Sequence, residues 1–301
     1  MRVSISRSVH TKSSARRSDR TGKSSERRAR AMLLAPPVAL LTIGFLMPIM
    51  LMGWLALSDP TFGLQNLGWV LNNSTQRDVL FRTFTTAAKV TTICIVLAYP
   101  YAYAMVVSRR KTLALLVLLV VTPFWTSLII RTFAWVILLQ DAGLVNRGIG
   151  ILGLGPFDII RTNIAVVIGM SQVLLPFMVL PLYAVMRNID RRLILASSSL
   201  GARPVTSFWR IWLPLSLPGV SAGALIVFIS SLGFYVTPAL LGSPGDSLVS
   251  QQIFTQIVGL LKWGRGAALG LFLLSATFVM LGSIWLLSRI ESSKWSKEMR
   301  R

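Results

Sequence analysis

The sequence predicts an all-α polytopic membrane protein with six transmembrane helices. Hydrophobic residues make up 53% of the 301 residues and charged residues only 14%, whereas a soluble domain needs about a quarter of its residues charged. The apolar residues gather in long uncharged runs, and about 20 such residues in a helix cross a hydrocarbon core of about 30 Å. The formal net charge of +21 comes from lysines and arginines that lie between the runs. Because a nucleic-acid-binding module has no use for such runs, the charge indicates membrane orientation rather than nucleic acid.

Six uncharged windows are long enough to cross a membrane. They cover residues 31–58, 90–108, 112–130, 162–186, 211–245 and 266–288. A seventh uncharged window, 247–261, is too short and too polar to cross, so we expect an interfacial or re-entrant helix there.

The basic residues divide unevenly between the segments that separate these windows. Lys and Arg number ten in 1–30, three in 109–111, five in 187–210 and five in 289–301. The alternate segments hold three in 59–89, three in 131–161 and two in 246–265. Because Lys and Arg accumulate in cytoplasmic loops, the sequence predicts that both termini and the 187–210 loop are cytoplasmic.

The composition also divides the chain into a membrane domain and two tails. Residues 1–30 are rich in Ser and Arg without apolar periodicity, which predicts a disordered basic cytoplasmic tail. Residues 31–290 form the six-span domain, and 291–301 a short basic cytoplasmic C-terminal tail. The apolar run that follows residue 30 is too long for a signal peptide, so we expect an uncleaved anchor.

The predicted spans lack the groups that several function classes need. None of the six windows contains Asp or Glu, whereas proton-coupled carriers and pumps keep an ionisable group at membrane depth. The single cysteine, Cys94, lies in an apolar run and the single histidine, His10, in the N-terminal tail, which argues against a disulfide, a metal site and histidine-centred catalysis. If the cargo is a cation, its tight recognition must happen outside the spans. On the expected outer side, five carboxylates could take part. They are Asp59, Asp78, Asp141, Asp158 and Asp246.

Prolines and aromatic residues in the apolar windows have two interpretations. One is kinked packing with interfacial aromatic belts, and the other is a gated pathway lined by aromatic side chains and unwound backbone. The candidate pathway residues are Pro100, Tyr101, Trp125, Pro176 and Tyr235.

The loop RNIDRRLILASSSLGARPVTSFWRIWLP (187–214) predicts a helix–Gly–helix element along the cytoplasmic membrane surface. Asp190 is placed to begin a helix, and Gly201 offers a stop where a left-handed backbone is needed. Pro204 fits the first turn of a second short helix. Four small side chains between them allow another surface to approach the backbone, although an ordinary amphipathic loop is the alternative. The four are Ala196, Ser197, Ser198 and Ser199, and the expected face of the second helix carries Phe208, Ile211 and Trp212.

This loop resembles the cytoplasmic signature of the membrane subunit of binding-protein-dependent ABC importers. That signature is Glu-Ala-Ala, three residues, Gly, nine residues and Ile-x-Leu-Pro, and the spacing around Gly201 is the same. The sequence departs from it with Leu195 in place of the acid and Ser197 in place of the second alanine. In the family, this segment is the coupling helix that docks in a cleft of the ATPase subunit, so the loss of the acid puts a charge pair there in doubt but not the docking shape. The implied ATPase-coupling residues are Leu195, Ala196, Ser197, Ser198, Gly201, Ile211, Leu213 and Pro214.

Two further stretches, 122–149 and 217–242, resemble spermidine/putrescine permeases, and the resemblance as a whole covers most of residues 32–290. It implies a permease subunit of a type I ABC importer in a bacterial inner membrane, moving a polyamine. The implied partners are a second permease, a dimer of cytoplasmic ATPases and a periplasmic solute-binding protein. The ATPase would use ATP and Mg²⁺, since this chain has no Gly-x-x-x-x-Gly-Lys-Ser/Thr loop, so we expect it to bind no cofactor and to be no enzyme by itself.

Three alternatives remain open at this point. The first is a permease for another solute, such as an opine, an amino-acid derivative, thiamine or iron. The second is a stand-alone secondary transporter or channel, which would need no ATPase docking loop. The third is a membrane-anchored nucleic-acid binder that works through residues 1–30.

Overall fold

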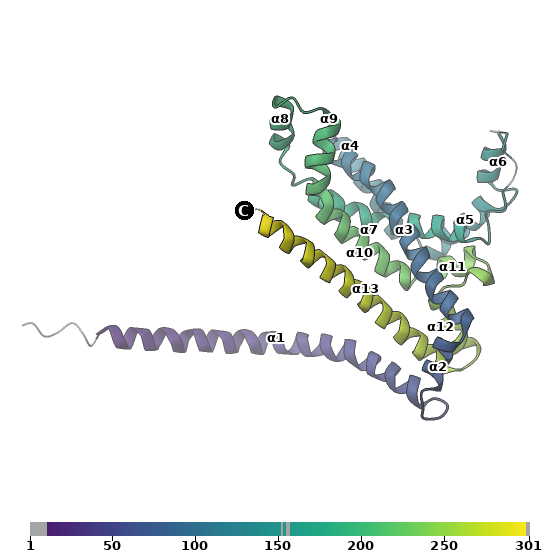
Figure 1. Cartoon of the computed structure of the whole chain (residues 1–301), viewed down its shortest axis with the longest axis horizontal. Coiled ribbons are helices and arrows are strands. Elements are labelled where there is room, and N and C mark those ends of the chain that lie inside the picture. Colours follow the sequence, from purple (N-terminus) through teal and green to yellow (C-terminus); the bar gives the residue numbers. More distant parts are fainter. Residues whose placement is uncertain (1–10, 152, 155–156, 299–301) are drawn as a thin grey trace, which may run out of the picture. The chain divides into compact units, whose positions relative to one another are not determined.

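The computed structural model describes residues 11–151, 153–154 and 157–298, and within these ranges the chain folds into helices joined by turns, without a strand (Figure 1). By its internal contacts the chain divides into two units, Met1–Trp54 and Leu55–Arg301. The prediction of an all-α polytopic fold is confirmed by the helices and by six segments that are long and apolar enough to span a membrane.

The first unit consists of one helix, α1 (Thr11–Ser58), which continues into the first residues of the second unit. The sequence predicts disorder over residues 1–30, but α1 includes 11–30, and residues 1–10 lie outside the described residues. Its Arg, Lys, Ala and Glu residues are good helix formers, and extending an existing helix needs no new nucleus. For these two reasons residues 11–30 continue the helix of the first apolar window, where the sequence predicts disorder.

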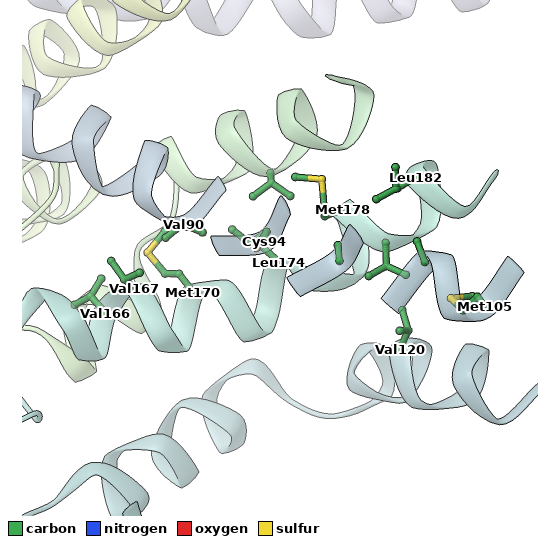
Figure 2. Packing of buried hydrophobic residues seen from close by; sticks show 14 of the residues in the cluster. Val90, Cys94, Met105, Val120, Val166, Val167, Met170, Leu174, Met178 and Leu182 are labelled. Carbon is green, nitrogen blue, oxygen red and sulfur yellow. The ribbon is translucent and has the colours of Figure 1, made fainter. Parts of the chain in front are cut away.

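Three helices form the core of the second unit: α3 (Ser74–Val107), α7 (Asn163–Met186) and α10 (Leu213–Leu232). Figure 2 shows Val90 and Cys94 of α3 against Met170 and Leu174 of α7, all buried. A glycine allows α10 to approach α7 closely, because a Cβ atom on Gly223 would lie 2.7 Å from the Met178 sulfur and 3.1 Å from the Met178 carbonyl oxygen. Small residues at such crossings are typical of helices packed in membranes.

The six candidate spans match the number that the sequence predicts. They are Ala35–Ser58, Ser74–Val107, Leu128–Ile151, Asn163–Met186, Pro204–Leu232 and Trp263–Ser283. The third window, 112–130, is not one helix. α4 (Arg110–Val121) passes into a 3₁₀ turn, η1 (Thr122–Trp125), and α5 (Leu128–Leu139) and α6 (Leu144–Ile151) follow. Pro123 in this turn lacks the N–H that an α-helix would use. The candidate span Leu128–Ile151 contains Arg131, Asp141 and Arg147, so it is not an uncharged window.

The fifth window also has different bounds in the structure. A short helix, α9 (Pro204–Ser207), a π-helical turn, η2 (Phe208–Trp212), and α10 follow one another directly, so the fifth candidate span starts at Pro204 and ends at Leu232. After a break at Gly233, the rest of the window forms α11 (Val236–Leu241).

The remaining elements connect and follow these spans. They are α2 (Gln65–Asn72), α8 (Arg191–Ser199), the 3₁₀ turn η3 (Pro244–Asp246), α12 (Val249–Phe254), the π-turn η4 (Thr255–Gly259) and α13 (Trp263–Glu298). The window 247–261 thus folds into α12 and η4, and it is not among the candidate spans. α13 includes residues 291–298 of the expected C-terminal tail.

Candidate coupling site

The helix that carries the signature begins and ends where the sequence predicts. The Asp190 carboxylate accepts a hydrogen bond from the backbone N–H of Arg192 at 2.9 Å and so caps α8. At the other end, Gly201 has φ +79°. The N–H of Gly201 donates to the Ser198 carbonyl and the N–H of Ala202 to the Ser197 carbonyl, both at 3.0 Å. This is the Schellman arrangement, in which a left-handed residue closes the last carbonyls of a helix.

A serine pair ties α8 to the element that follows the turn. The hydroxyl oxygens of Ser197 and Ser207 lie 2.7 Å apart and are hydrogen-bonded, and Ser207 is buried. Pro204 begins α9 at its first turn, as expected. Ser197 is one of the two departures from the family signature, and an alanine there could not make this bond. The departure therefore has a structural role within this loop.

The second helix of the element is not a separate surface helix, which corrects the sequence prediction. It continues through η2 into the fifth candidate span. Phe208 and Trp212 of η2 face α3, as the ring of Phe208 meets that of Tyr99 at 5.8 Å and the ring of Trp212 meets that of Tyr103 at 5.4 Å, both edge to face. Sequence reasoning placed the two aromatic residues on one face but could not find their partners, which lie more than one hundred positions away in the chain.

The structure separates the predicted coupling residues into two groups. The first group is exposed at the turn and comprises Leu195, Ala196, Ser198 and Gly201, with Ser197 half-buried beside them. The second group begins the fifth span and comprises Ile211 and Leu213, both half-buried, and the exposed Pro214. Only the first group is therefore presented as a surface, and the second connects that surface to α10.

Sequence reasoning missed three exposed apolar side chains at this turn. Leu200 is 89% exposed, Val205 67% and Trp209 62%, beside Leu195 at 67%. The signal that could have found them is the presence of large apolar residues in a short polar loop. Arg192, Arg203 and Arg210 are exposed in the same segment. The turn therefore combines apolar side chains with positive charge, and its one carboxylate, on Asp190, is engaged in capping α8.

The five candidate pathway residues are distributed over four parts of the fold. Pro100 and Tyr101 are in α3, Trp125 is in η1, Pro176 is in α7 and Tyr235 precedes α11. The Tyr101 hydroxyl donates to the Leu116 carbonyl of α4 at 2.8 Å, and the Tyr235 ring lies 4.9 Å from that of Phe254. Among these described residues no hydrogen bond or ring contact joins any two of the five, and their role in a pathway stays a prediction.

Two of the five carboxylates that the sequence predicts on the outer side serve as caps. Asp59 accepts from the N–H of Gly264 at 2.6 Å, and Asp246 accepts from the Ser243 hydroxyl at 2.6 Å. Asp78, Asp141 and Asp158 are exposed. Within the described ranges, no group of three or more His, Cys, Asp or Glu residues could hold a metal ion.

Comparison with known proteins places this arrangement in a family. No family model matches the chain. The spermidine/putrescine transport system permease PotB of Escherichia coli K12 is 33% identical over 258 residues, covering 83% of this chain and 94% of PotB. PotB of Haemophilus influenzae is 36% identical over 216 residues, covering 70% and 75%. The inner membrane ABC transporter permease YdcU of E. coli K12 is 29% identical over 272 residues, covering 83% of each.

The solved structures agree in fold. A bacterial ABC transporter involved in the import of the acidic polysaccharide alginate contains a chain with a TM-score of 0.67 and 16% identity, covering 90% of this chain and 98% of that one. The alginate transporter in complex with a pentasaccharide-bound periplasmic protein gives 0.68 and 17%, covering 86% and 93%. The helices and the helix–Gly–helix turn thus define a multi-pass permease of the type I ABC importer class. Within this class, the chain belongs to the family of the spermidine/putrescine permease PotB, whose members are named as transport components rather than catalysts.

Proposed function

We propose that this chain is the membrane-spanning permease subunit of an ATP-driven importer of polyamines such as spermidine and putrescine. The observation that carries the proposal is the likeness to PotB over 258 residues and 94% of its length. The proposed location is the bacterial inner membrane, with both termini and the 187–214 loop in the cytoplasm, because the basic residues concentrate in those segments.

The proposed partners divide the work of the importer. A periplasmic binding protein delivers the solute, a second permease completes the pathway, and a dimer of cytoplasmic ATPases binds ATP and Mg²⁺. The alginate transporter, whose structure includes a periplasmic protein, supports a binding-protein partner through its fold. In this scheme the present chain binds no cofactor and performs no catalysis by itself.

The exposed turn of the 187–214 loop is the proposed docking element for the ATPase. Leu195 and Leu200 are exposed to water at 67% and 89%, and covering a leucine side chain contributes about 1.5–3 kcal/mol. Small side chains at Ala196 and Ser198 let the partner approach the helix backbone. With Leu195 in the position of the acid, docking rests on apolar contact and shape, and no ion pair forms at residue 195.

The proposed mechanism uses the direct connection between this turn and the fifth span. When the ATPases close on ATP, the turn moves with them, and α9, η2 and α10 carry the movement into the membrane domain without an intervening loop. The two nucleotide states then favour opposite openings of the pathway, because each makes different contacts with the element. A polycation passes without tight binding because the core spans α3, α7 and α10 carry Asp or Glu only at Asp78, near the start of α3.

Transport by a reconstituted complex tests this function. The permeases, the ATPase and the binding protein are placed in proteoliposomes, and ATP-driven uptake of radiolabelled spermidine is measured. We expect Gly201→Trp to abolish uptake while the complex still inserts, because a bulky residue with φ +79° distorts the docking turn. Gly153→Trp is the matched control, since Gly153 has φ +74° and open space around it, as Gly201 has.

Three results would contradict the proposal. Uptake that needs no ATPase indicates a secondary transporter or channel. Uptake of thiamine, iron or an opine in place of spermidine indicates another solute. Equal losses in Gly201→Trp and Gly153→Trp indicate a general effect of strain rather than a docking role for the turn.

A further inference from the structure

Two aromatic pairs join η2 to α3, directly after the exposed docking turn of residues 192–205, which we call the coupling turn. Tyr99 of α3 meets Phe208, with ring centroids 5.8 Å apart and planes at 81°, and Tyr103 meets Trp212 at 5.4 Å and 86°. Both pairs have the edge-to-face geometry that aromatic rings prefer. The partners are four residues apart on each side, so the pairs form two successive rungs. We call these four residues the aromatic clamp.

The clamp is anchored as well as aligned. Trp212 is 3% exposed, and the Tyr99 hydroxyl also lies 3.0 Å from the hydroxyl of Ser216 in the first turn of α10. The two ring residues of the turn side, Phe208 and Trp212, are the first and last residues of the π-turn η2. A π-turn adds a residue to a helix turn and is frequent at functional sites. Here it lies between α9, which follows the coupling turn, and α10.

A proline lies between the two rungs. Pro100 is inside α3 and follows Tyr99, with Tyr103 three residues further on. Because proline has no N–H and its ring crowds the preceding turn, a helix can bend at this point at lower cost than elsewhere. The clamp therefore holds α3 on both sides of the residue at which α3 is least supported by its own hydrogen bonds.

We propose that the aromatic clamp transmits the movement of the coupling turn to α3 at Pro100, in addition to the covalent route through α10. This inference rests on the proposed function, since it assumes that an ATPase moves the turn. The segment of α3 after Pro100, up to Val107, then moves together with η2. Tyr99, Tyr103, Phe208 and Trp212 act as positioning residues, and Pro100 acts as the hinge rather than as a lining residue of the pathway.

Variants of the second rung test the clamp in the complete complex in proteoliposomes. Tyr103→Leu and Trp212→Leu each remove one ring, and Tyr103, which is 42% exposed, can be replaced with little effect on folding. We expect the number of ATP molecules hydrolysed per spermidine imported to rise about five-fold in each. The double variant should be no worse than the single ones, because both changes break the same contact.

A third aromatic pair, between α3 and α10, provides the matched control. Phe84 of α3 and Phe228 of α10 lie 6.3 Å apart and do not touch the coupling turn. Phe84→Leu should leave the ratio of ATP to solute within about two-fold of the unchanged protein. The clamp is overturned if Phe84→Leu raises this ratio as much as Trp212→Leu does, or if Tyr103→Leu leaves it unchanged.

Distance measurement gives a readout that a merely structural role would not move. Cys94→Ser first removes the native thiol. Spin labels are then attached to cysteines that replace Val107 of α3 and Val205 of α9, which are both exposed. We expect the same distance distribution with and without ATP, and a nucleotide-dependent one once Tyr103→Leu is added. A distribution that already changes with nucleotide in the presence of the intact clamp refutes the inference.

Failure of the clamp and failure of the proposed function are distinguishable. If Gly201→Trp uncouples ATP hydrolysis from uptake while the clamp variants do not, the turn docks the ATPase but the movement reaches the membrane through α10 alone. If Gly201→Trp leaves uptake fully coupled as well, the proposed docking function itself is wrong.

Discussion

The coupling turn and the segments at the start of α13 both join helices outside the packed core, but they differ in how their polar groups are paired. At the start of α13, polar groups of the chain satisfy one another. Asp59 accepts from the N–H of Gly264 at 2.6 Å, and the Asn66 side chain donates to the carbonyls of Ala56 and Asp59 at 3.0 and 2.6 Å. At the coupling turn, the apolar Leu195 and Leu200 are exposed to solvent.

The charged groups show the same difference. At the start of α13, the guanidinium of Arg265 lies 4.8 Å from the ring centre of Trp69, a cation–π contact, beside a cavity of about 200 Å³ that Asp59 and Lys262 help to line. At the coupling turn, Arg192 and Arg203 are exposed. The first region therefore pairs its polar groups within the chain, although Leu261 and Trp263 there are exposed as well, whereas the exposed leucines of the second lie beside exposed arginines and form the surface that we propose an ATPase covers.

The two regions also differ in why each contains a glycine. A Cβ atom on Gly264 would lie 2.5 Å from the Asp59 carbonyl oxygen and 3.0 Å from that of Leu55, so glycine is needed there for space. A Cβ atom on Gly201 would meet nothing within 4 Å, and glycine is needed only for its φ of +79°. Substitutions at the start of α13 should therefore lower the stability of the fold, and those at the coupling turn should mainly affect the coupling of ATP hydrolysis to transport.

The largest effect on stability is expected for Gly264→Ala. The added methyl group has backbone on more than one side and cannot be accommodated by a side-chain rotation, so the free energy of unfolding should fall by about 3 kcal/mol. Thermal unfolding in detergent measures this loss. Gly148→Ala is the control, because Gly148 has open space and a helical position, and it should be neutral or slightly stabilising. A loss at Gly264 as small as that at Gly148 would contradict the close packing.

A smaller loss is expected for Asp59→Ala. It removes the carboxylate that accepts from Gly264 at the first turn of α13, and a charge-assisted hydrogen bond of this kind contributes about 1.5–3 kcal/mol. Chemical unfolding in detergent provides the measurement. Asp78→Ala removes an exposed carboxylate and should change stability by less than about 0.5 kcal/mol. Equal effects of the two changes would show that Asp59 is not a specific cap.

At the coupling turn, Leu195→Glu restores the acid of the family signature and should nevertheless weaken the complex. The exposed leucine is the group that we expect the ATPase to cover, so the dissociation constant of the ATPase should rise about ten-fold, equivalent to about 1.4 kcal/mol. A binding assay with the purified subunits measures it. Leu64→Glu, at a leucine that is 69% exposed near α2, should have no such effect. Tighter binding by Leu195→Glu would show that the cleft of the ATPase favours a carboxylate over a leucine at residue 195.

The smallest effect is expected for Ser197→Ala, which restores the second departure from the signature. It removes the hydrogen bond to Ser207 and should lower the free energy of unfolding by about 1 kcal/mol. Ser199→Ala, which loses only an exposed bond to its own helix at the Leu195 carbonyl, should cost less. Thermal unfolding of the two variants side by side measures both losses. A larger loss for Ser199→Ala than for Ser197→Ala would contradict the structural role assigned to Ser197.

The sequence by itself determined the features that depend on neighbouring residues. The number of candidate spans follows from hydrophobic length, and the start of α8 at Asp190 and its end at Gly201 follow from capping and from the φ that glycine allows. Local reasoning failed where a charge or a proline interrupts a run, as at Pro123 and Arg131 in the third window.

Only the tertiary structure decided which distant residues meet. Tyr103 and Trp212 lie more than one hundred residues apart, and the bond from Gly264 to Asp59 joins residues 205 positions apart. No local pattern specifies such pairs, because they depend on how the helices pack in three dimensions. For the same reason the sequence could name five pathway candidates but could not show which of them lie near one another.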